Sequence, residues 1–579
     1  MAIFTPSESP AIVTKEVDLT GVVPNVQSST GAIVGNFRWG PVEEATLIDN
    51  DASLAATFGQ PGETEAVDFL SAAYFLRYSN SLQVVRAATS AAKNATDIAV
   101  ASQPMVKNDA NFLSQQAALD SDLNVFVGRY PGDLGNSLQV SSCPVSTGDS
   151  AFNNWAYKSS FDAAPGTSAA AAAAGASNDE IHVAVVDEDG LITGTRGEVL
   201  ETYPFLSLAS NAKSPEGSTI NIKDVINSAS DFIHMAGYGD STTAFSTDAG
   251  KALANGLNYE DSAGNGNHVR TVSLANGVGS AALTTAEFAT GHDLLEDKDT
   301  ITVDFLIAPG MASRTDQTTV VNDLVSTAGS TRKDCIVVAS PARSDIVNSS
   351  TPNANAVTTA NTFTNSSYLV TDNNYLKVYD KYNDKFRFIP AASSTAGIMA
   401  ATDLNAAPWF SPAGSRRGQY LGITSLSYSP TKAERDTLYK AGVNPIGNIP
   451  GQGVLLFGDK TKLNRPSAFD RINVRRLFLV IERAISVAAR NTLFEFNDEF
   501  TRAEFVNIVE PFLREIKGRR GITDFRVVAD ETNNTGAVID RNEFVANVFI
   551  KPARSINYIT LNFVAVRSGV DFEEVAGTV

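Results

Sequence analysis

Histidine and cysteine, which most often bind metals or act as nucleophiles, are rare in this chain of 579 residues. The four histidines show no i, i+4 spacing, and none pairs with a cysteine: His182, His234, His268 and His292. A zinc site needs several ligands at one point, and close spacing is its usual signature. Neither Cys143 nor Cys335 has a recognisable nucleophile context. We therefore expect no metal site and no catalytic cysteine.

Two short segments match ligand-binding motifs only in part. Residues 453–461, GVLLFGDKT, resemble a phosphate-binding loop, but Asp459 displaces the lysine and puts a negative charge where phosphate would sit. Their apolar residues predict a buried strand instead. Residues 187–190, DEDG, begin like a calcium loop but lack its third acidic ligand, and only Glu198 stands at position 12. A hairpin tip explains them more simply, so we expect no cofactor.

Length and composition indicate a folded protein of three or four domains. The chain is too long for a single core, and its 43% apolar and 19% charged residues are ordinary for a folded protein. No apolar run approaches the ~20 residues of a membrane span, and the opening MAIFTPSESP does not resemble a secretory signal. Two widely separated cysteines fit a reducing compartment.

The net charge of −19 argues against nucleic-acid binding and is unevenly spread. From Lys460 onward there are 18 Lys+Arg and 16 Asp+Glu, or +2, which leaves 27 and 48, or −21, for the preceding residues. Either this is an ordinary acidic surface, or the C-terminal part faces an acidic partner.

Residues 470–566 organise the chain and begin with two amphipathic helices. The second helix is predicted to start with a capping box at Thr501 and Glu504 and to kink or break at Pro511. Gly518 and Gly521 are its stop signals. In the first helix Arg475 and Arg476 are expected on the polar faces. Its apolar face carries Val474, Leu477, Phe478, Ile481, Ala484, Ile485 and Ala488.

Strand-like runs follow at 525–529, 543–551 and 555–567. The last of them alternates apolar and polar residues, so it lies either in its own sheet or at the sheet edge of another chain. Residues 1–20 also alternate and no helix follows them. They are either a frayed terminus or a second strand given to another subunit.

The first part of the chain changes in composition along its length. Residues 21–90 predict strands at 31–37 and 82–87, a helix at 66–78 and a shorter helix capped by Ser53. In the Ala- and Ser-rich region that follows, residues 168–176 indicate a mobile loop more than a helix. Residues 181–186 and 191–195 predict a hairpin around an Asp-Gly turn. Apolar strands return at 302–308 and 334–340.

Several segments, in this order, resemble the contractile tail sheath proteins of phages and related injection machines. The segments NVRRLFLVIERAI, FEFND, FLREI and ITLNFVAV are similar to the family's C-terminal domain, and GAIVGNFRWGPV and AAYFLRYSNSLQVVRA to its N-terminal region. PWFSPAGSRRG, LYKAGVNPIGNI and GVLLFGDKTKL occur between them in the family's order. The resemblance covers roughly residues 1–90, 121–140, 181–235 and 300–567.

The resemblance implies an α+β / α/β multidomain fold. It has a C-terminal α+β sheath core with two helices and a mixed sheet, plus inserted β-rich outer domains. The implied division is an N-terminal arm (1–20), two parts of an α/β sheath domain (21–90 and 301–365), inserted domains (91–180 and 181–300), the sheath core (366–567) and a tail (568–579).

The resemblance also implies a structural subunit and not an enzyme. Such subunits form a homo-oligomeric sheath of stacked six-membered rings in the virion tail, assembled in the host cytoplasm, which contracts to drive the tail tube through the host envelope. Implied partners are the tube, baseplate and neck or tail terminator proteins, without nucleic acid or membrane insertion. A sheath from a phage-like bacteriocin or injection apparatus, and an unrelated multidomain enzyme, are the alternatives.

Two sets of residues are expected to carry this function. The strands shared between subunits are expected to contain Pro10, Ile12, Val13, Val17, Leu19, Ile559, Leu561 and Phe563. The residues expected to face the tube are the basic residues Arg475, Arg476, Lys517, Arg519 and Arg520.

Overall fold

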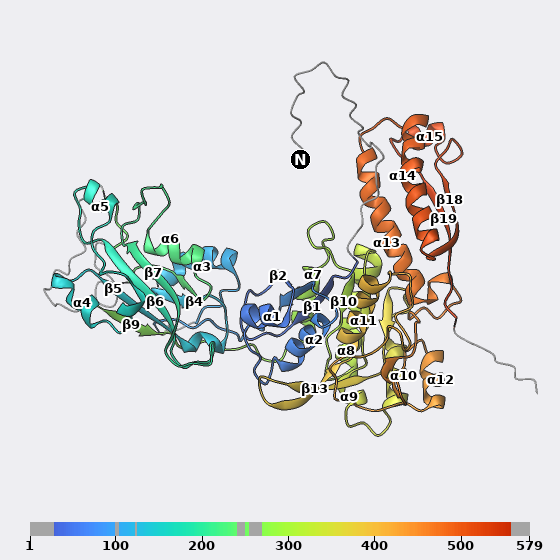
Figure 1. Cartoon of the computed structure of the whole chain (residues 1–579), viewed down its shortest axis with the longest axis horizontal. Helices are drawn as coiled ribbons and strands as arrows, with labels where there is room; N and C mark the ends of the chain where they lie inside the picture. Colours follow the sequence, from blue (N-terminus) through green and yellow to red (C-terminus); the bar gives the residue numbers. More distant parts are fainter. Residues whose placement is uncertain (1–27, 99–102, 122–123, 240–248, 254–268, 557–579) are drawn as a thin grey trace, which may run out of the picture. The chain divides into compact units, whose positions relative to one another are not determined.

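The computed structural model describes residues 28–98, 103–121, 124–239, 249–253 and 269–556. Their contacts divide them into two compact units. The larger unit holds residues 28–408 and 412–484, and the smaller holds residues 409–411 and 485–556. Each unit is compact by its own internal contacts (Figure 1).

A six-stranded sheet forms the centre of the larger unit, in the order β12-β11-β10-β1-β3-β2. All neighbours are parallel except β2, which runs antiparallel to β3 at one edge. The predicted strands at 31–37, 82–87, 302–308 and 334–340 are all present, although shorter. The bounds are β1 (Gly31–Gly35), β2 (Ala45–Ile48), β3 (Leu82–Arg86), β10 (Phe305–Ile307), β11 (Ile336–Ala339) and β12 (Leu369–Thr371).

Helices cover both faces of this sheet, which explains why its strands are apolar throughout. Ile33 and Val84 face α2 (Ala66–Leu76), α11 (Ala392–Asn405) and the start of α13 (Ile472–Ala489). Val34 and Val85 face α7 (Thr285–Asp293) and α8 (Arg314–Ser326). The unit is therefore a three-layer α/β structure. It also contains α1 (Asp51–Phe58), α9 (Arg343–Ile346) and α10 (Pro352–Thr362).

The predicted cap of α1 is wrong by one turn. Asn50, not Ser53, is the N-cap, and its side chain accepts a hydrogen bond from the Ser53 N–H at 2.9 Å. An asparagine side chain satisfies a free N–H of the first turn as well as serine does. The helix therefore begins before the serine.

Smaller sheets complete the larger unit near α12 (Lys432–Lys440). Strands β13 (Tyr375–Asp380), β14 (Lys385–Pro390) and β15 (Ser425–Leu426) form one antiparallel sheet. A hairpin joins β16 (Ile446–Ile449) to β17 (Gly453–Leu456). The segment that resembles a phosphate loop thus contains a strand, as predicted.

One inserted domain, residues 97–274, interrupts the larger unit. Its main sheet has the order β7-β6-β5-β9, and β4 pairs with β8 beside a shared apolar core. The expected division at residue 180 falls between β5 and β6, which are neighbours in this sheet. The bounds are α3 (Asp109–Ser121), β4 (Phe126–Gly128), β5 (Leu138–Pro144), α4 (Ser150–Asn154), α5 (Ala169–Ala173), β6 (Glu180–Asp187), β7 (Glu198–Ser207), α6 (Ile222–Ala229), β8 (Ile233–Met235) and β9 (Arg270–Ser273).

Two local predictions within this domain are also wrong. The run expected as a mobile loop contains the helix α5, because Ser168 caps it by accepting the Ala171 N–H at 3.1 Å and alanine favours helix. The return strand expected at 191–195 begins only at β7. Before it, the carboxylate of Asp187 accepts backbone N–H groups from Gly190, Ile192 and Thr193, which fixes a loop there.

The smaller unit is built from α14 (Glu499–Gly518) packed on the antiparallel hairpin of β18 (Ile522–Val528) and β19 (Asn547–Pro552), with the short α15 (Gly536–Ile539) between the strands. The N-cap of α14 is Asp498, which accepts the Thr501 N–H at 2.8 Å, so the capping box at Thr501 is wrong. The helix does not break at Pro511. Val509 and Leu513, on either side, are fully buried, and this packing outweighs one lost hydrogen bond.

Candidate assembly surfaces

The two-stranded hairpin of the smaller unit presents two unpaired edges within the described chain. Strands β18 and β19 bond to each other from Val528–Asn547 to Ile522–Pro552, and no further described strand joins either one. Side chains alternate along β19: Val548 and Ile550 are half-buried, whereas Phe549 is 58% exposed. Unpaired N–H and C=O groups beside an exposed aromatic ring suit the addition of a strand from another chain.

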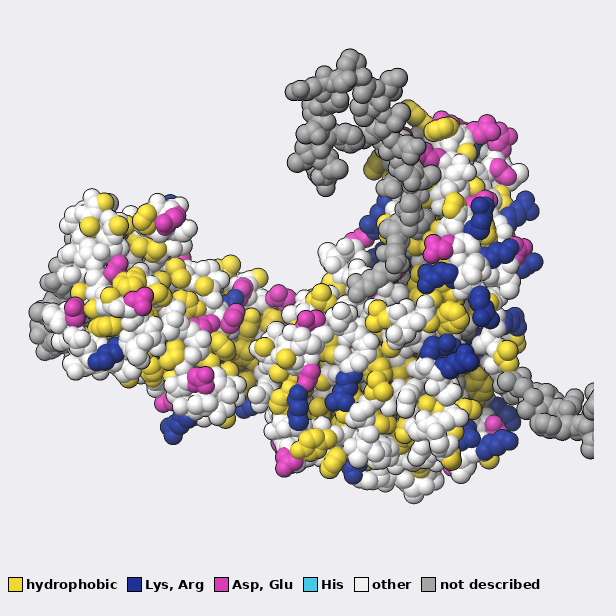
Figure 2. All heavy atoms as spheres, in the orientation of Figure 1, with side chains coloured by type: hydrophobic (Ala, Val, Ile, Leu, Met, Phe, Trp, Pro, Cys, Tyr) yellow, Lys and Arg dark blue, Asp and Glu magenta, His cyan; other side chains and the backbone are white. Residues whose placement is uncertain are grey.

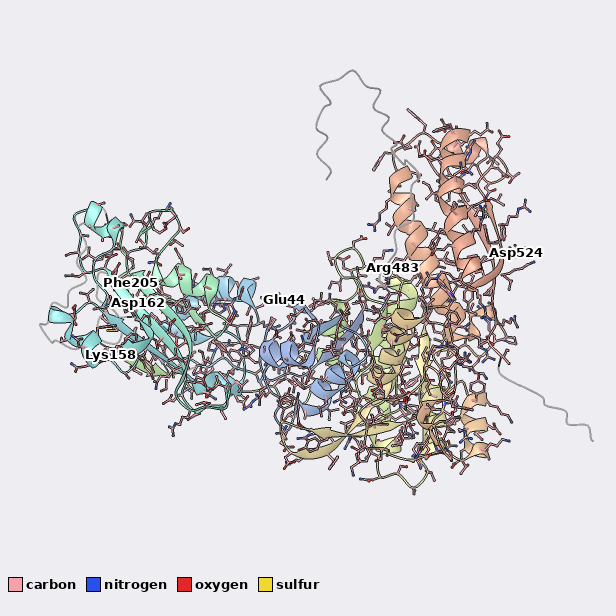
Figure 3. The ribbon with its side chains drawn as sticks, viewed as in Figure 1. Glu44, Lys158, Asp162, Phe205, Arg483 and Asp524 are labelled. Atoms are coloured by element: carbon pink, nitrogen blue, oxygen red, sulfur yellow. The ribbon has the colours of Figure 1, made fainter. Side chains whose placement is uncertain are left out.

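A short basic segment lies where α14 ends. Lys517, Arg519 and Arg520 are all exposed. Lys517 Nζ is 3.1 Å from the Asp524 carboxylate, and Arg519 is 3.6 Å from Glu515. Two of the three charges thus already have carboxylate neighbours. Asp524 projects from β18 in Figure 3.

Close packing of backbone and ring holds this segment in place. The indole N–H of Trp409 donates to the Arg519 carbonyl at 3.1 Å, and the Arg519 guanidinium lies 5.0 Å from the indole centre. Gly521 lies so close that an added Cβ would be 2.6 Å from Ile516 and 3.0 Å from the Trp409 ring. The chain can turn from α14 into β18 here only because residue 521 has no side chain.

Arg475 and Arg476, expected on polar faces of α13, are instead enclosed in the larger unit, at 8% and 5% exposure. Arg475 donates to Ser367 Oγ and stacks between Tyr368 and Phe469 at 4.2 and 4.3 Å. Arg476 forms an ion pair with Asp403, which is equally buried. The prediction was wrong because these partners come from distant parts of the chain. Guanidiniums so enclosed do not present charge at the surface of this chain.

Arg476 and Arg483 fasten α13 to the sheet layer. Arg483, labelled in Figure 3, donates to Asp304 at 2.6 Å and to the carbonyls of Val303 and Asp334 at 3.0 and 2.9 Å. Asp304 in turn accepts the Thr30 N–H beside β1. Sequence reasoning missed this role for Arg483. The available signal was its seven-residue spacing from Arg476, which puts both on one side of the helix.

The residues expected in the shared strands lie outside the described residues. This holds for the N-terminal set from Pro10 to Leu19 and for Ile559, Leu561 and Phe563. The described residues include the β18–β19 hairpin, and the strands shared between subunits stay a prediction.

The described histidines and cysteines lie in packed cores. His182 stacks on Phe161 at 4.6 Å, accepts the Phe205 N–H at Nδ1 and contacts the Ala163 carbonyl through Nε2 (Phe205 is labelled in Figure 3). His234 stacks on Phe112 at 4.0 Å. Burial raises the pKa of Cys143 to about 12, which keeps its thiol protonated.

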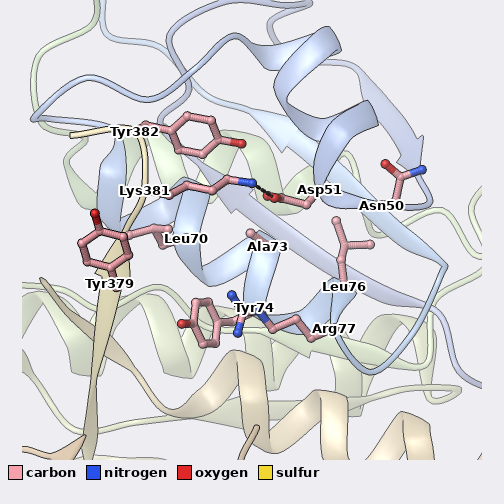
Figure 4. A pocket seen from close by; sticks show the side chains of 10 residues that line it. All are labelled: Asn50, Asp51, Leu70, Ala73, Tyr74, Leu76, Arg77, Tyr379, Lys381 and Tyr382. Atoms are coloured by element: carbon pink, nitrogen blue, oxygen red, sulfur yellow. Dashed lines mark hydrogen bonds and ion pairs between the residues drawn. The ribbon is translucent and has the colours of Figure 1, made fainter. Parts of the chain in front are cut away.

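Within the described ranges, no group of three or more His, Cys, Asp or Glu side chains could hold a metal ion, and no helix has the length and apolarity to cross a membrane. A hollow of about 120 Å³ beside α2 contains the ion pair between Lys381 and Asp51 (Figure 4). A larger and more basic pocket lies beside α12.

The architecture is that of sheath tail proteins. A crystal structure of the sheath tail protein from Listeria innocua superposes with a TM-score of 0.55 over 92% of this chain and 93% of that chain, at 12% identity. The sheath tail protein of Desulfitobacterium hafniense gives a TM-score of 0.50 over 90% and 94%, at 13% identity. At such identities the likeness concerns the fold.

Sequence comparison assigns the family. Residues 288–462 match the phage tail sheath protein central domain, and residues 464–565 match the phage tail sheath C-terminal domain. The tail sheath protein of Enterobacteria phage T4 is 33% identical, and that of Vibrio phage KVP40 is 31% identical, each aligned over 98% of this chain and 99% of the relative. The chain belongs to the phage tail sheath protein family, as its sequence predicted.

Proposed function

We propose that this chain is the sheath subunit of a contractile phage tail. Its copies stack as six-membered rings around a tail tube, and contraction of the stack drives the tube through the host envelope. The observation that carries this proposal is the end-to-end match to the tail sheath protein of phage T4. Sheaths of bacteriocins and injection machines are the second candidate, and a match along nearly the whole length of phage proteins favours the phage tail.

Strand exchange at the β18–β19 hairpin is the proposed link between subunits. Residues 10–19 of one neighbour and 558–566 of another add to its unpaired edges. Each backbone hydrogen bond contributes about 1 kcal/mol net, so a short added strand supplies several kcal/mol per link. Such links bond through the backbone and can persist while the rigid bodies they join rotate during contraction.

The tube contact is proposed at Lys517, Arg519 and Arg520. Because carboxylates of the same chain already lie beside Lys517 and Arg519, the attraction to an acidic tube surface is modest and depends on salt. A modest attraction suits a sheath that must move along its tube. The proposed baseplate and terminator contacts follow from the same assembly.

Deleting residues 1–20 tests the strand exchange. The shortened chain should keep its melting temperature, because an arm given to a neighbour adds little to its own core. It should form no tubes in negative-stain micrographs, whereas the full chain should form long striated tubes. Normal tubes from the shortened chain would contradict the link, and a large fall in melting temperature would show that the arm belongs to its own subunit.

Charge reversal tests the tube contact. Changing Lys517, Arg519 and Arg520 to Glu should reduce co-sedimentation of the sheath with tube protein at low salt. Arg514→Glu is the matched control, because Arg514 is 71% exposed on the same helix but lies outside the basic segment. Equal co-sedimentation of the triple variant and the control would refute this contact.

A further inference from the structure

An open pocket of about 530 Å³ lies in the larger unit where α12 ends. Its wall includes the last turn of α12, the 460–466 segment and Asn361 of α10. The volume lies within the ~300–1,000 Å³ of typical ligand sites. Neither the hairpin nor the basic segment of α14 contributes to it.

The pocket carries an excess of positive charge. Lys440, Lys460 and Arg465 line it, against the single carboxylate of Asp470. That carboxylate lies 3.6 Å from Arg471. No described carboxylate forms an ion pair with the three lining cations. In Figure 2, Lys and Arg side chains gather in the region of α12.

Backbone carbonyls at the end of α12 accept hydrogen bonds from two lysines, and the ammonium of Lys460 also lies 4.1 Å from the centre of the Tyr439 ring. Lys460 Nζ donates to the Tyr439 carbonyl at 2.8 Å, and Lys462 Nζ donates to the Ala441 carbonyl at 2.7 Å. Lysines commonly compensate the carbonyls that end a helix. An ammonium has three donors, and among the described residues Lys460, the one of the two that lines the pocket, uses one of them for this hydrogen bond.

Burial makes an anionic partner favourable here. Lys460, which lines the pocket, is partly buried, and burial lowers its pKa. A desolvated cation without a carboxylate partner is costly, and an incoming carboxylate offsets that cost. The pocket thus has the size, charge and held donors of a site for an acidic peptide.

We propose that this pocket binds the acidic segment of residues 571–574, Asp-Phe-Glu-Glu, from a second copy of the chain. This segment, outside the described residues, carries three carboxylates in four positions, and three cations line the pocket. The choice of a second copy rests on the proposed function, because a strand 558–566 donated to a neighbour carries residues 571–574 with it. The pocket then forms a second, ionic contact between subunits.

A labelled peptide of residues 568–579 tests the pocket by fluorescence anisotropy with the full chain. Changing Lys440 and Arg465 to Gln should weaken its binding about tenfold, as expected for two lost charge pairs. Arg416→Gln with Lys432→Gln is the matched control, because both cations are exposed and lie outside the pocket. The peptide with Asp571→Asn, Glu573→Gln and Glu574→Gln should not bind.

Three results of this experiment would overturn the proposal. They are equal binding by the pocket and control variants, equal binding of the neutral peptide, and displacement of the peptide by inorganic phosphate at a comparable concentration. The last would indicate a general anion site instead of a peptide site.

Cross-linking identifies which copy supplies the segment. Tubes grown from mixed ¹⁴N and ¹⁵N chains and treated with a carbodiimide should give mixed-isotope links between residues 571–574 and Lys440 or Lys460. Links only within one copy, or tubes without such links, would overturn the inference and leave the sheath function standing. Absence of tubes would count against the sheath function, and the peptide measurement would still decide the pocket.

Discussion

Replacing Arg476 with Met tests whether α13 is fastened to the sheet by its buried ion pair. The change removes the guanidinium that pairs with Asp403 and donates to the carbonyls of Met399 and Ser28 at 3.0 and 3.1 Å. Asp403 would remain buried without its cation. Removing one partner of a buried pair costs about 3–5 kcal/mol. At about 2 °C per kcal/mol for a large domain, the melting temperature should fall by about 6–10 °C at pH 8.

The effect should depend on pH in a defined direction. Burial, partly opposed by Arg476, raises the pKa of Asp403 to about 6, above its ordinary 3.8. A carboxyl with a raised pKa binds its proton more tightly in the folded state, so stability falls as pH rises from about 4 through the folded pKa. Without Arg476, the pH range over which stability falls extends to higher pH, because no cation opposes the effect of burial on the pKa of Asp403. The loss in Arg476→Met should therefore be smaller at pH 6 than at pH 8.

Differential scanning fluorimetry at pH 6 and pH 8 measures the melting temperatures of Arg476→Met and of the parent chain. Arg514→Met is the control, because Arg514 is 71% exposed. Replacing both members of the pair, with Arg476→Met and Asp403→Leu, should recover much of the loss, because no buried charge is left unpaired. A single variant that melts within about 1 °C of the parent at both pH values would refute the reasoning.

Three further predictions concern other parts of the chain. Gly521→Ala should destabilise the smaller unit by about 1–3 kcal/mol in urea unfolding, whereas Gly518→Ala, where an added Cβ has no neighbour within 4 Å, should not. Burial lowers the pKa of His182, and it lowers the pKa of His234 to about 3. The stability that these neutral histidines give the folded state is therefore complete above about pH 6.5 and is lost as pH falls. The inserted domain should melt at a lower temperature at pH 5 than at pH 7, and His182→Gln should make the melting temperature depend less steeply on pH. Replacing residues 97–274 with a short Gly/Ser linker should leave a folded, tube-forming chain, and loss of tubes despite a cooperative melt would contradict this.

The elements that depend on local pattern were predicted well. The continuous apolar runs of β1, β3, β10 and β11 read correctly as strands covered on both faces. The apolar stripe of α13 is buried at Val474, Leu477 and Ile481. Such patterns need only nearby residues, because a helix or strand repeats its faces within a few positions.

The errors arose where residues distant in the sequence determine the local structure. A helical pattern assigns Arg475 and Arg476 to a polar face, but residues far from them in the sequence, such as Ser367 and Asp403, help to enclose them. Pro511 is a helix breaker by propensity, and packing in the smaller unit keeps α14 continuous across it. The joining of β5 to β6 was hidden because the intervening residues 145–179 are rich in Ala, Ser and Asn and resemble a mobile insertion.

The two crossings into the inserted domain lie side by side. Lys93 and Val278 exchange backbone hydrogen bonds at 3.0 Å, and Thr96 and Ala275 do so at 2.9 and 3.0 Å. The guanidinium of the fully buried Arg86 donates to the carbonyls of Gly40 and Pro131 at 2.7 and 2.5 Å. Because Pro131 lies in the inserted domain and Gly40 precedes it, these hydrogen bonds join the domain to the rest of the larger unit. An inserted domain at this place needs only that its first and last residues lie about 5 Å apart, which is the spacing of neighbouring strands. Recombination between tail genes could thus exchange the whole domain at two short junctions without disturbing the α/β body, and a foreign domain could be displayed in the same place.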